Sequence, residues 1–457
     1  MNFQGKKTLV AGIAKSGISA ALLLKKLGAD VTISDSKSED KITEDISKLK
    51  ENGINLYLGK NPDDIVTEQD LLVLSPGVPC DLNFVVEAEK NNIPVWSEIE
   101  LGYRLCPCPI VAITGTNGKT TTTSLVGEIF KNFADKVAVV GNIGIPFTEK
   151  VTELDEKSYV VAEISSFQLE KTVDFKPIVS AVLNITPDHL NRHKTVENYT
   201  KTKMRIFEKQ DKDDYLVLNY SDLACRDMKK FANCKVLYFA KANSLDKLGL
   251  SEGVYSNGDS IFVKFNQYDQ KVIDVSELKI LGWHNVENAM AAIGISLAAN
   301  VPMDIIVDTL KKFTAVEHRI EYVTTINDIE FYNDSKGTNP DAAIKAIDAM
   351  KRPICLIGGG YDKKSEFDEW VKAFDGKVKY LSVIGEVTEK IIETAEKYGF
   401  KNYERASSLE EAVQKCFENA EAGDCVLLSP ACASWDMFDS YEQRGRLFKE
   451  FAKNLGR

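Results

Sequence analysis

Apolar runs and amphipathic segments alternate along the first hundred residues, which is the pattern of strands followed by helices. The runs at 8–14 and 31–35 are typical of buried parallel strands, and an amphipathic helix that ends at Gly28 separates them. A later run at 71–77 closes on a Ser-Pro-Gly turn. Strands and helices that alternate in this way predict a doubly wound parallel sheet. The sequence LCPCP then interrupts the pattern, and we place the first domain boundary near residue 105.

A second α/β unit is predicted from residue 109 onward. Hairpin strands are expected within 253–280, with a turn at SNGDS, and an amphipathic helix at 284–300. The second boundary is expected near residue 315, in TAVEHRIE. The other elements of this unit are strands at 109–115, 136–141, 158–164 and 178–185 and a long helix at about 196–209.

A third α/β unit follows, and its first strand enters a glycine turn. Its elements are strands at 352–360, 380–385 and 425–430 and a closing helix at 441–456. The predicted fold class is therefore α/β with three domains, at 1–105, 106–315 and 316–457. Because no low-complexity linker separates them, we expect short hinges.

The composition limits the classes of partner. Among 457 residues, Lys and Arg total 57 and Asp and Glu total 68, so the net charge is −11. An acidic chain disfavours broad binding to nucleic acid or to an anionic membrane, although a small anionic ligand needs only a local cluster of donors. There is no apolar run of about 18 residues and no signal-peptide pattern, and the nine cysteines include no CxxC pair. We therefore expect a cytoplasmic monomer that binds small molecules, with neither structural zinc nor a disulfide framework.

The sharpest chemical signal is AITGTNGKTTTTS, in which a strand runs into a glycine turn and then a helix. Gly115 and Gly118 let backbone N–H groups turn toward an anion, and the helix N-terminus favours negative charge. Lys119 supplies a positive charge for phosphates, and the Thr120 hydroxyl can bind Mg²⁺. The spacing departs from GxxxxGK[ST], because Ile113 stands at the first glycine position. The alternative is a solvated turn rich in threonine.

A weaker glycine turn, GIAKSG at 12–17, follows the first strand. It resembles GxGxxG with Ala14 in place of the second glycine, and Asp35 ends the next strand, where a ribose-binding acid would lie. A nucleotide other than NAD is the better prediction. A turn that only packs a helix against a strand is the alternative.

Candidate metal ligands lie at two later strand ends. Glu163 ends a strand in AEISSFQLE, and a phosphate loop needs a carboxylate at a neighbouring strand end to hold Mg²⁺. His189 lies between a strand and a helix in NITPDHLNRH, where a metal or a phosphate could reach it. A third turn, GNIGIP, also follows a strand. A single histidine is usually structural, but all four histidines (189, 193, 284 and 318) fall in motif-like segments.

These motifs together resemble the Mur ligases, the ATP-dependent amide-forming enzymes of peptidoglycan precursor synthesis. The resemblance implies a Rossmann-like N-terminal domain for a UDP substrate, a central P-loop-type ATPase domain and a Rossmann-like C-terminal domain for an amino acid. YNDSKGTNP together with SPACASWDMFDSYEQRG narrows the resemblance to the members that add D-glutamate to UDP-N-acetylmuramoyl-L-alanine through an acyl phosphate, and a DNPR-type signature for a diamino acid is absent from the sequence. The resemblance rests also on GWHNVEN (282–288), EHRIE (317–321), YNDSKGTNP (332–340) and SPACASWDMFDSYEQRG (429–445).

The resemblance assigns the catalytic centre to Lys119, Glu163, His189 and Lys203. Thr120 and Glu163 would hold one Mg²⁺, and His189 and Lys203 a second. In the family, the lysine that matches Lys203 in YTKTKMRIF is converted to a carbamate by CO₂, and a carbamate binds Mg²⁺ where an ammonium group cannot. An exposed helix lysine is the alternative, because Lys201 lies only two residues away.

The resemblance also implies contacts for ATP and for the UDP substrate. The ATP set comprises Gly115, Thr116, Asn117, Gly118, Lys119, Thr120, Thr121, Asn285, Asn288, Arg319 and Asp334. The UDP-substrate set comprises Lys15, Ser16, Asp35, Ser36, Lys37, Ser75, Pro76, Gly77 and Asn142.

For D-glutamate, the resemblance implies Thr338 and Lys363 at one carboxylate and Ser434 and Tyr441 at the other. The adjacent Lys364 leaves the position of the cation open by one residue. Two other functions remain open at this point: an amide ligase for a different amino acid, and a nucleotide-regulated binding protein without turnover.

Overall fold

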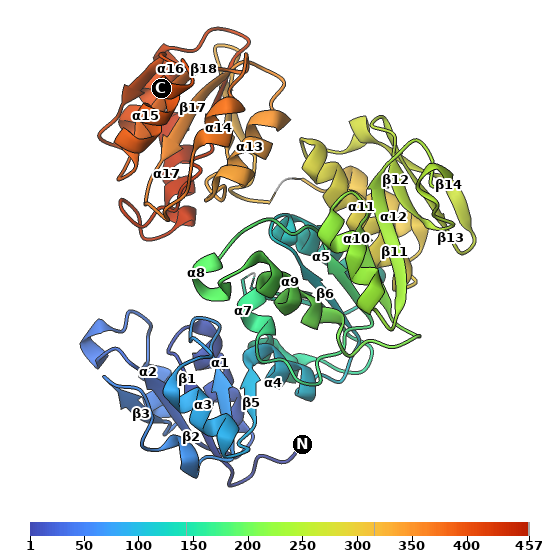
Figure 1. Ribbon diagram of the computed structural model, residues 1–457, viewed down its shortest axis with the longest axis vertical. Helices are drawn as coiled ribbons and strands as arrows, with labels where there is room; N and C mark the ends of the chain where they lie inside the picture. The colour runs from blue at the N-terminus through green and yellow to red at the C-terminus, as the bar shows by residue number, and fades with distance from the viewer. Residues whose placement is uncertain (143, 315, 456–457) are drawn as a thin grey trace. The chain divides into compact units, whose positions relative to one another are not determined.

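The computed structural model describes residues 1–142, 144–314 and 316–455, and its strands form three separate sheets (Figure 1). The chain divides into two compact units. The first unit contains residues 1–277 and 287–311, and the second contains residues 278–286 and the chain from Lys312 onward. The predicted α/β fold class is confirmed by these sheets. Ala315, where the second domain boundary is expected, lies outside the described residues.

The first sheet of the first unit has five parallel strands in the order β3-β2-β1-β4-β5. The order reverses between β1 and β4, which creates a crevice at the carboxyl ends of the strands where α/β proteins usually bind ligands. The strands are β1 (Lys7–Ala11), β2 (Asp30–Asp35), β3 (Asn55–Leu58), β4 (Leu71–Leu74) and β5 (Val95–Ser97). The helices are α1 (Lys15–Lys26), α2 (Ser47–Glu51), α3 (Asn83–Lys90) and α4 (Glu98–Leu105).

The second sheet of the first unit has nine strands in the order β14-β13-β12-β11-β10-β9-β6-β8-β7. The strands from β7 to β12 in this order are parallel, and the predicted hairpin is confirmed because β12, β13 and β14 pair antiparallel. The strands are β6 (Ile110–Thr114), β7 (Val137–Gly141), β8 (Tyr159–Glu163), β9 (Val179–Val182), β10 (Tyr215–Asn219), β11 (Lys235–Lys241), β12 (Gly253–Ser256), β13 (Ser260–Phe265) and β14 (Tyr268–Asp274). The helices that accompany this sheet are α5 (Lys119–Phe133), α6 (Phe147–Lys150), α7 (Ser166–Leu169), α8 (Leu190–His193), α9 (Val196–Met204), α10 (Leu223–Asp227), α11 (Trp283–Ala298) and α12 (Met303–Lys312). The helix expected at about 196–209 ends earlier, since a 3₁₀ turn at Arg205–Phe207 follows α9.

The sheet of the second unit has six strands in the order β15-β16-β20-β17-β18-β19. A hairpin that sequence analysis does not predict, β15 (Glu321–Ile326) with β16 (Ile329–Asn333), pairs antiparallel at one edge. The other strands are β17 (Ile354–Gly359), β18 (Val378–Ile384), β19 (Tyr403–Arg405) and β20 (Cys425–Leu428), all in parallel pairing. The helices are α13 (Pro340–Ala349), α14 (Asp368–Lys372), α15 (Thr388–Lys397), α16 (Leu409–Glu418) and α17 (Tyr441–Asn454).

Parallel strands of the first sheet and of the six-stranded sheet are buried on both faces, because successive apolar residues of a strand point to opposite sides. In β4, Leu71 and Val73 pack into one apolar cluster and Leu72 and Leu74 into another. In β17, the neighbouring residues Leu356 and Ile357 likewise pack into two different apolar clusters, one on each face of the sheet. This explains why the strands are continuous apolar runs in the sequence.

Within the described part of the chain, no helix combines the length and the apolar character that a membrane span requires.

Candidate active site

The phosphate loop connects β6 to α5 in the first unit, and a glycine at its end, Gly118, shapes it. Gly118 caps α5 with a φ of 83°, and a Cβ at this position would lie 2.3 Å from Asn288 Oδ1. Asn184, two residues after the end of β9, fixes the loop, because its side chain accepts from the Asn117 amide at 2.8 Å and donates to the Asn117 carbonyl at 3.0 Å. Only glycine fits the αL cap here without strain. The loop is therefore held in one shape by partners outside it.

Several threonines of this motif are buried, which excludes the alternative of a solvated turn. Thr116, Thr120 and Thr121 are each less than a tenth exposed. The Thr116 hydroxyl donates to the Thr186 carbonyl at 3.1 Å, and the buried Thr121 hydroxyl has no hydrogen-bond partner among the described residues.

Two lysines converge on the phosphate loop. Lys119 donates to the carbonyls of Gly115 at 2.9 Å and Thr116 at 2.8 Å. Lys203 reaches the same Gly115 carbonyl at 2.9 Å from α9, and its side chain also donates to the Thr114 hydroxyl at 3.3 Å. Since both side chains donate to the Gly115 carbonyl, the positive charge of Lys119 lies near Lys203 and disfavours the charged form of Lys203.

Lys203 is 1% exposed, so the alternative of an exposed helix lysine is wrong. Burial, together with the charge of Lys119, holds the pKa of Lys203 well below its ordinary value. The nitrogen also lies 4.7 Å from the ring centroid of Tyr199. A lowered pKa increases the fraction of neutral amine, which is the nucleophilic form.

Glu163 ends β8 beside the phosphate loop, because β8 pairs with β6 in a register that aligns Glu163 with Ile113. Its Oε1 accepts from the Asn142 side chain at 2.7 Å. Its Oε2 is buried and has no partner among the described residues. A buried carboxylate oxygen without a partner is costly unless a cation or a donor completes it. Asn142 therefore contacts this carboxylate; the adjacent Ile143 of GNIGIP lies outside the described residues.

His189 caps the short helix α8 with a left-handed φ of 53°. Its ring packs against Phe167, with centroids 4.8 Å apart, and its Nε2 lies 3.6 Å from Asp188 Oδ2. Phe167 belongs to α7, which follows Glu163 along the chain. The side chain of His189 is 45% exposed, so its imidazole remains accessible to a ligand.

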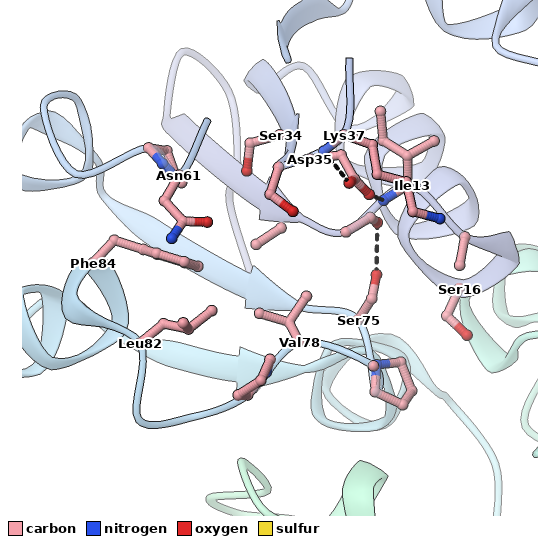
Figure 2. A pocket seen from close by; sticks show the side chains of 18 of the residues that line it. Ile13, Ser16, Ser34, Asp35, Lys37, Asn61, Ser75, Val78, Leu82 and Phe84 are labelled. Carbon is pink, nitrogen blue, oxygen red and sulfur yellow. Dashed lines mark hydrogen bonds between the residues drawn. The ribbon is translucent and has the colours of Figure 1, made fainter. Parts of the chain in front are cut away.

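The turns after β1, β2 and β4 surround a cavity of about 670 Å³ (Figure 2). Asp35 organises its rim by accepting from the amides of Ile13 and Lys37, both at 2.9 Å, and Ser75 donates to the Gly12 carbonyl at 2.8 Å. Eight of the nine residues predicted for the UDP substrate line this cavity, namely Lys15, Ser16, Asp35, Ser36, Lys37, Ser75, Pro76 and Gly77. The ninth, Asn142, is not among its lining residues.

Sequence analysis misses the far wall of this cavity. Asn61, Leu82 and Phe84 line it, and Figure 2 shows them across from the glycine turn. They offer an amide and apolar surface, which suit the edge and the face of a base. Asn61 lies in a loop without periodicity, so no sequence pattern singles it out.

In the second unit, Arg319 lies between two residues with strained backbone. His318 has a φ of 65° and Ile320 a φ of 47°, a conformation that a β-branched residue rarely adopts. The buried Nε of Arg319 has no partner among the described residues. Burial raises the pKa of the nearby Asp334 to about 7, although Arg319 opposes that shift. Backbone strain of this kind persists only where the surrounding contacts hold the residue in place, and such residues are often found at ligand sites.

The acids beside His318 do not form an open metal site. Glu317 and Glu321 lie close enough to His318 to share a cation. The Lys449 ammonium, however, pairs with both carboxylates, at 2.6 and 3.0 Å. Asn333 contacts His318 Nδ1 at 2.9 Å and thereby orients the ring.

The remaining predicted ATP residues contact nearby segments of their own units. Asn285 donates to the Leu281 carbonyl at 2.7 Å in the second unit. Asn288 accepts from the Thr122 hydroxyl at 3.2 Å in the first unit, beside the phosphate loop.

The four residues predicted for D-glutamate lie on the segments that follow β16, β17 and β20. These strands are neighbours and parallel, so their carboxyl ends meet at one edge of the sheet. Lys363 lies over the ring of Trp435 at 5.2 Å, next to Ser434. The buried Arg444 ties two of these segments together, because it donates to the carbonyls of Ser335, Cys432 and Ala433. Thr338 and Tyr441 belong to the segments after β16 and β20, respectively.

Three family models match the chain: a Mur ligase MurD-like N-terminal domain over residues 6–97, a Mur ligase middle domain over 113–296, and a Mur ligase glutamate ligase domain over 318–432. The chain belongs to the Mur ligase family. Among Mur ligases, it is 51% identical over 459 residues to the UDP-N-acetylmuramoylalanine–D-glutamate ligase of Thermoanaerobacter sp. (strain X514), with all of both chains covered. It is 50% identical over 455 residues to the enzyme of the same name from Lachnospira eligens, again with both chains fully covered.

Solved structures of other Mur ligases and of related ligases share the fold at low identity. A pseudomurein peptide ligase type C from Methanothermus fervidus aligns with a TM-score of 0.62 and 19% identity, covering 99% of this chain and 100% of that one. The MurF ligase from Thermotoga maritima in complex with ADP aligns with a TM-score of 0.59 and 16% identity, covering 99% and 96%. These likenesses concern the architecture alone.

Proposed function

We propose that this Mur ligase joins D-glutamate to UDP-N-acetylmuramoyl-L-alanine at the expense of ATP, in cytoplasmic peptidoglycan precursor synthesis. The observation that carries the proposal is the identity of 51% over the full length to a relative named for that activity. We further propose that the chain acts as a monomer on these small-molecule substrates.

We further propose one role for each part of the chain. Residues 1–105 bind the UDP substrate, residues 106–315 bind ATP, and residues 316–457 bind the amino acid. The cavity at the switch point of the first sheet supports the first role, and the phosphate loop at the end of β6 supports the second.

In the proposed reaction, ATP phosphorylates the carboxylate of the alanyl substrate to give an acyl phosphate and ADP. The amine of D-glutamate then attacks the acyl carbon, an amide bond forms, and phosphate leaves. Lys119 and the loop amides hold the phosphates while charge moves between oxygens, and Arg319 neutralises further phosphate charge. Positioning and charge neutralisation are the main tasks of a protein in phosphoryl transfer.

The donor set at the phosphate loop fits Mg²⁺. The buried Oε2 of Glu163, which has no hydrogen-bond partner among the described residues, and the accessible His189 support this proposal. Thr120 supplies a hydroxyl at the start of α5. Lys203 adds oxygen ligands when CO₂ adds to its neutral amine and releases a proton, which forms a carbamate. Bound there, Mg²⁺ would neutralise phosphate charge and orient the transferred group.

The direct test of the proposed function is ADP release from the purified chain. We expect release only when ATP, UDP-N-acetylmuramoyl-L-alanine and D-glutamate are all present, and weak or no release with L-glutamate, L-alanine or a diamino acid. Release that another amino acid supports better would assign the chain to a different ligase. Tight nucleotide binding without ADP release would favour the alternative of a nucleotide-regulated binding protein without turnover. Such a protein has no need of Glu163 and His189.

Replacing Lys363 with alanine is expected to raise the KM for D-glutamate by about 10- to 100-fold, since a charge-assisted hydrogen bond to a carboxylate contributes about 1.5–3 kcal/mol. The KM for ATP should stay near the wild-type value. Steady-state kinetics with each substrate varied in turn measures both. Lys364 is the matched control, because it is adjacent, exposed and in a left-handed backbone conformation (φ 61°). If Lys364→Ala shows the defect and Lys363→Ala does not, the cation lies one residue later.

A further inference from the structure

Arg192 of α8 contacts the rim of the cavity that the turns after β1, β2 and β4 surround. We call this cavity, the proposed site of the UDP substrate, the nucleotide-sugar cavity. Its guanidinium donates to the carbonyls of Pro76 at 3.0 Å, Gly77 at 3.4 Å and Val78 at 2.9 Å. These three residues follow β4 and line the cavity. A planar guanidinium with five donors can hold three carbonyls and a carboxylate at once, which a lysine cannot.

The other side of the guanidinium is held by Glu170. Arg192 makes a forked ion pair with both carboxylate oxygens of Glu170, and both side chains are about 15% exposed. The Cys80 thiol also donates to this carboxylate, at 3.2 Å. Contacts of this kind between charged, mostly buried groups are stronger than surface pairs.

Arg192 and His189 share one aromatic platform. The guanidinium carbon lies 4.4 Å from the centroid of the Phe167 ring, and the His189 ring packs against the same residue at 4.8 Å. Arg192 belongs to α8, and His189 is the N-terminal cap of that helix. α8 has only four residues, and no side chain caps its N-terminus by a hydrogen bond. A helix this short has little stability of its own, so its contacts with other segments determine where His189 lies.

We propose that Arg192 is a positioning residue that connects the nucleotide-sugar cavity to His189. Substrate in the cavity contacts the turn after β4. That turn holds the guanidinium, and the guanidinium holds α8 in the place where His189 meets the phosphate-transfer centre. The inference rests on the proposed function, because it assigns the cavity to the UDP substrate and His189 to the catalytic centre.

The test compares Arg192→Ala and Arg192→Lys with the wild-type chain. We expect Arg192→Ala to raise the KM for UDP-N-acetylmuramoyl-L-alanine and to lower kcat, each by about tenfold or more, while the KM for ATP changes by less than about twofold. Arg192→Lys should fall between Arg192→Ala and wild type, because it keeps the charge but not the fork. Glu170→Gln provides a second route to the same result, in case the alanine variant is unstable.

Lys171→Ala is the matched control, because Lys171 forms an ion pair with Glu89 of α3 and makes no contact with the turn at 76–78 in the described structure. We expect its kinetics to match the wild type. The inference is overturned if Arg192→Ala leaves both constants for the UDP substrate unchanged. It is equally overturned if Arg192→Ala raises the KM for ATP as much as the KM for the UDP substrate and also lowers the midpoint of thermal unfolding, because that result indicates a general loss of stability. A wild-type chain without D-glutamate-dependent ADP release contradicts the proposed function instead, so the two failures are distinguishable.

Discussion

Replacement of Lys119 by alanine is expected to lower kcat by roughly a thousandfold or more, with little change in fold. The ammonium group contacts the loop carbonyls of Gly115 and Thr116, so it lies at the start of α5, where phosphates would bind. Its charge matters most in the transition state, when charge spreads over the transferred oxygens. Initial rates of ADP release measure the loss, and circular dichroism with a thermal melt tests the fold.

Lys131→Ala is the control for this variant. Lys131 lies on the same helix, its side chain is 51% exposed, and it pairs with Glu128 three residues earlier. Exposed pairs of this kind contribute little, so we expect full activity. The loop should keep its shape in Lys119→Ala, because Asn184 binds Asn117 independently of the lysine. Near-normal turnover in a folded Lys119→Ala chain would remove the phosphate-loop assignment.

The sequence predicts those parts of the fold and site in which local pattern and chemistry coincide. β4 and β17 are continuous apolar runs because both faces of their sheets are buried, and their positions follow from that pattern. Glu163 is predicted at a strand end and found there, since a phosphate loop and its carboxylate lie on neighbouring parallel strands. For Glu163, the residue type, its position at a strand end and its chemistry all favour the same role, that of a carboxylate beside the phosphate loop.

Features that depend on contacts between distant segments are not predictable from one sequence. Arg192 contacts residues more than a hundred positions earlier, and nothing in DHLNRH indicates that partner. Phe84 of the cavity wall lies on the amphipathic helix α3, and nothing in the sequence of that helix distinguishes it from an ordinary core residue. The β15–β16 hairpin is missed because β15 has no buried residue, so its sequence lacks the alternation of apolar and polar positions that identifies a half-buried strand.

The distinction between Lys201 and Lys203 also required the structure. Both lie on α9, but the Lys201 side chain is 67% exposed and pairs with Glu197, whereas Lys203 is buried against the phosphate loop. Sequence spacing places two lysines on one helix and cannot state which of them faces the core. Burial therefore selects Lys203 as the candidate for modification.

Replacement of Lys203 by alanine is expected to leave the chain nearly inactive, and a small carboxylate in the buffer is expected to restore part of the rate. Burial and the charge of Lys119 lower the pKa of Lys203, which increases the fraction of neutral amine that can add CO₂. The resulting carbamate carries one negative charge and two oxygens, which suit Mg²⁺. Formate or acetate could occupy the space that the side chain leaves and supply the same ligand atoms. ADP release at increasing formate, acetate and chloride concentrations measures the rescue, with chloride as the test for ionic strength alone.

Lys201→Ala is the internal control, since it removes the same residue type two positions away from an exposed site. We expect it to be fully active and indifferent to carboxylate. An active Lys203→Ala chain would refute the carbamate, because a metal ligand cannot be removed without loss of rate.

Mass spectrometry of wild-type protein incubated with ¹³C-labelled bicarbonate and trapped by alkylation provides a readout that does not depend on activity. Label on the peptide that contains Lys203, and its absence from that peptide in the Lys203→Arg variant, is the expected result. Label elsewhere, or none in the wild type, contradicts the assignment even if the alanine variant is inactive.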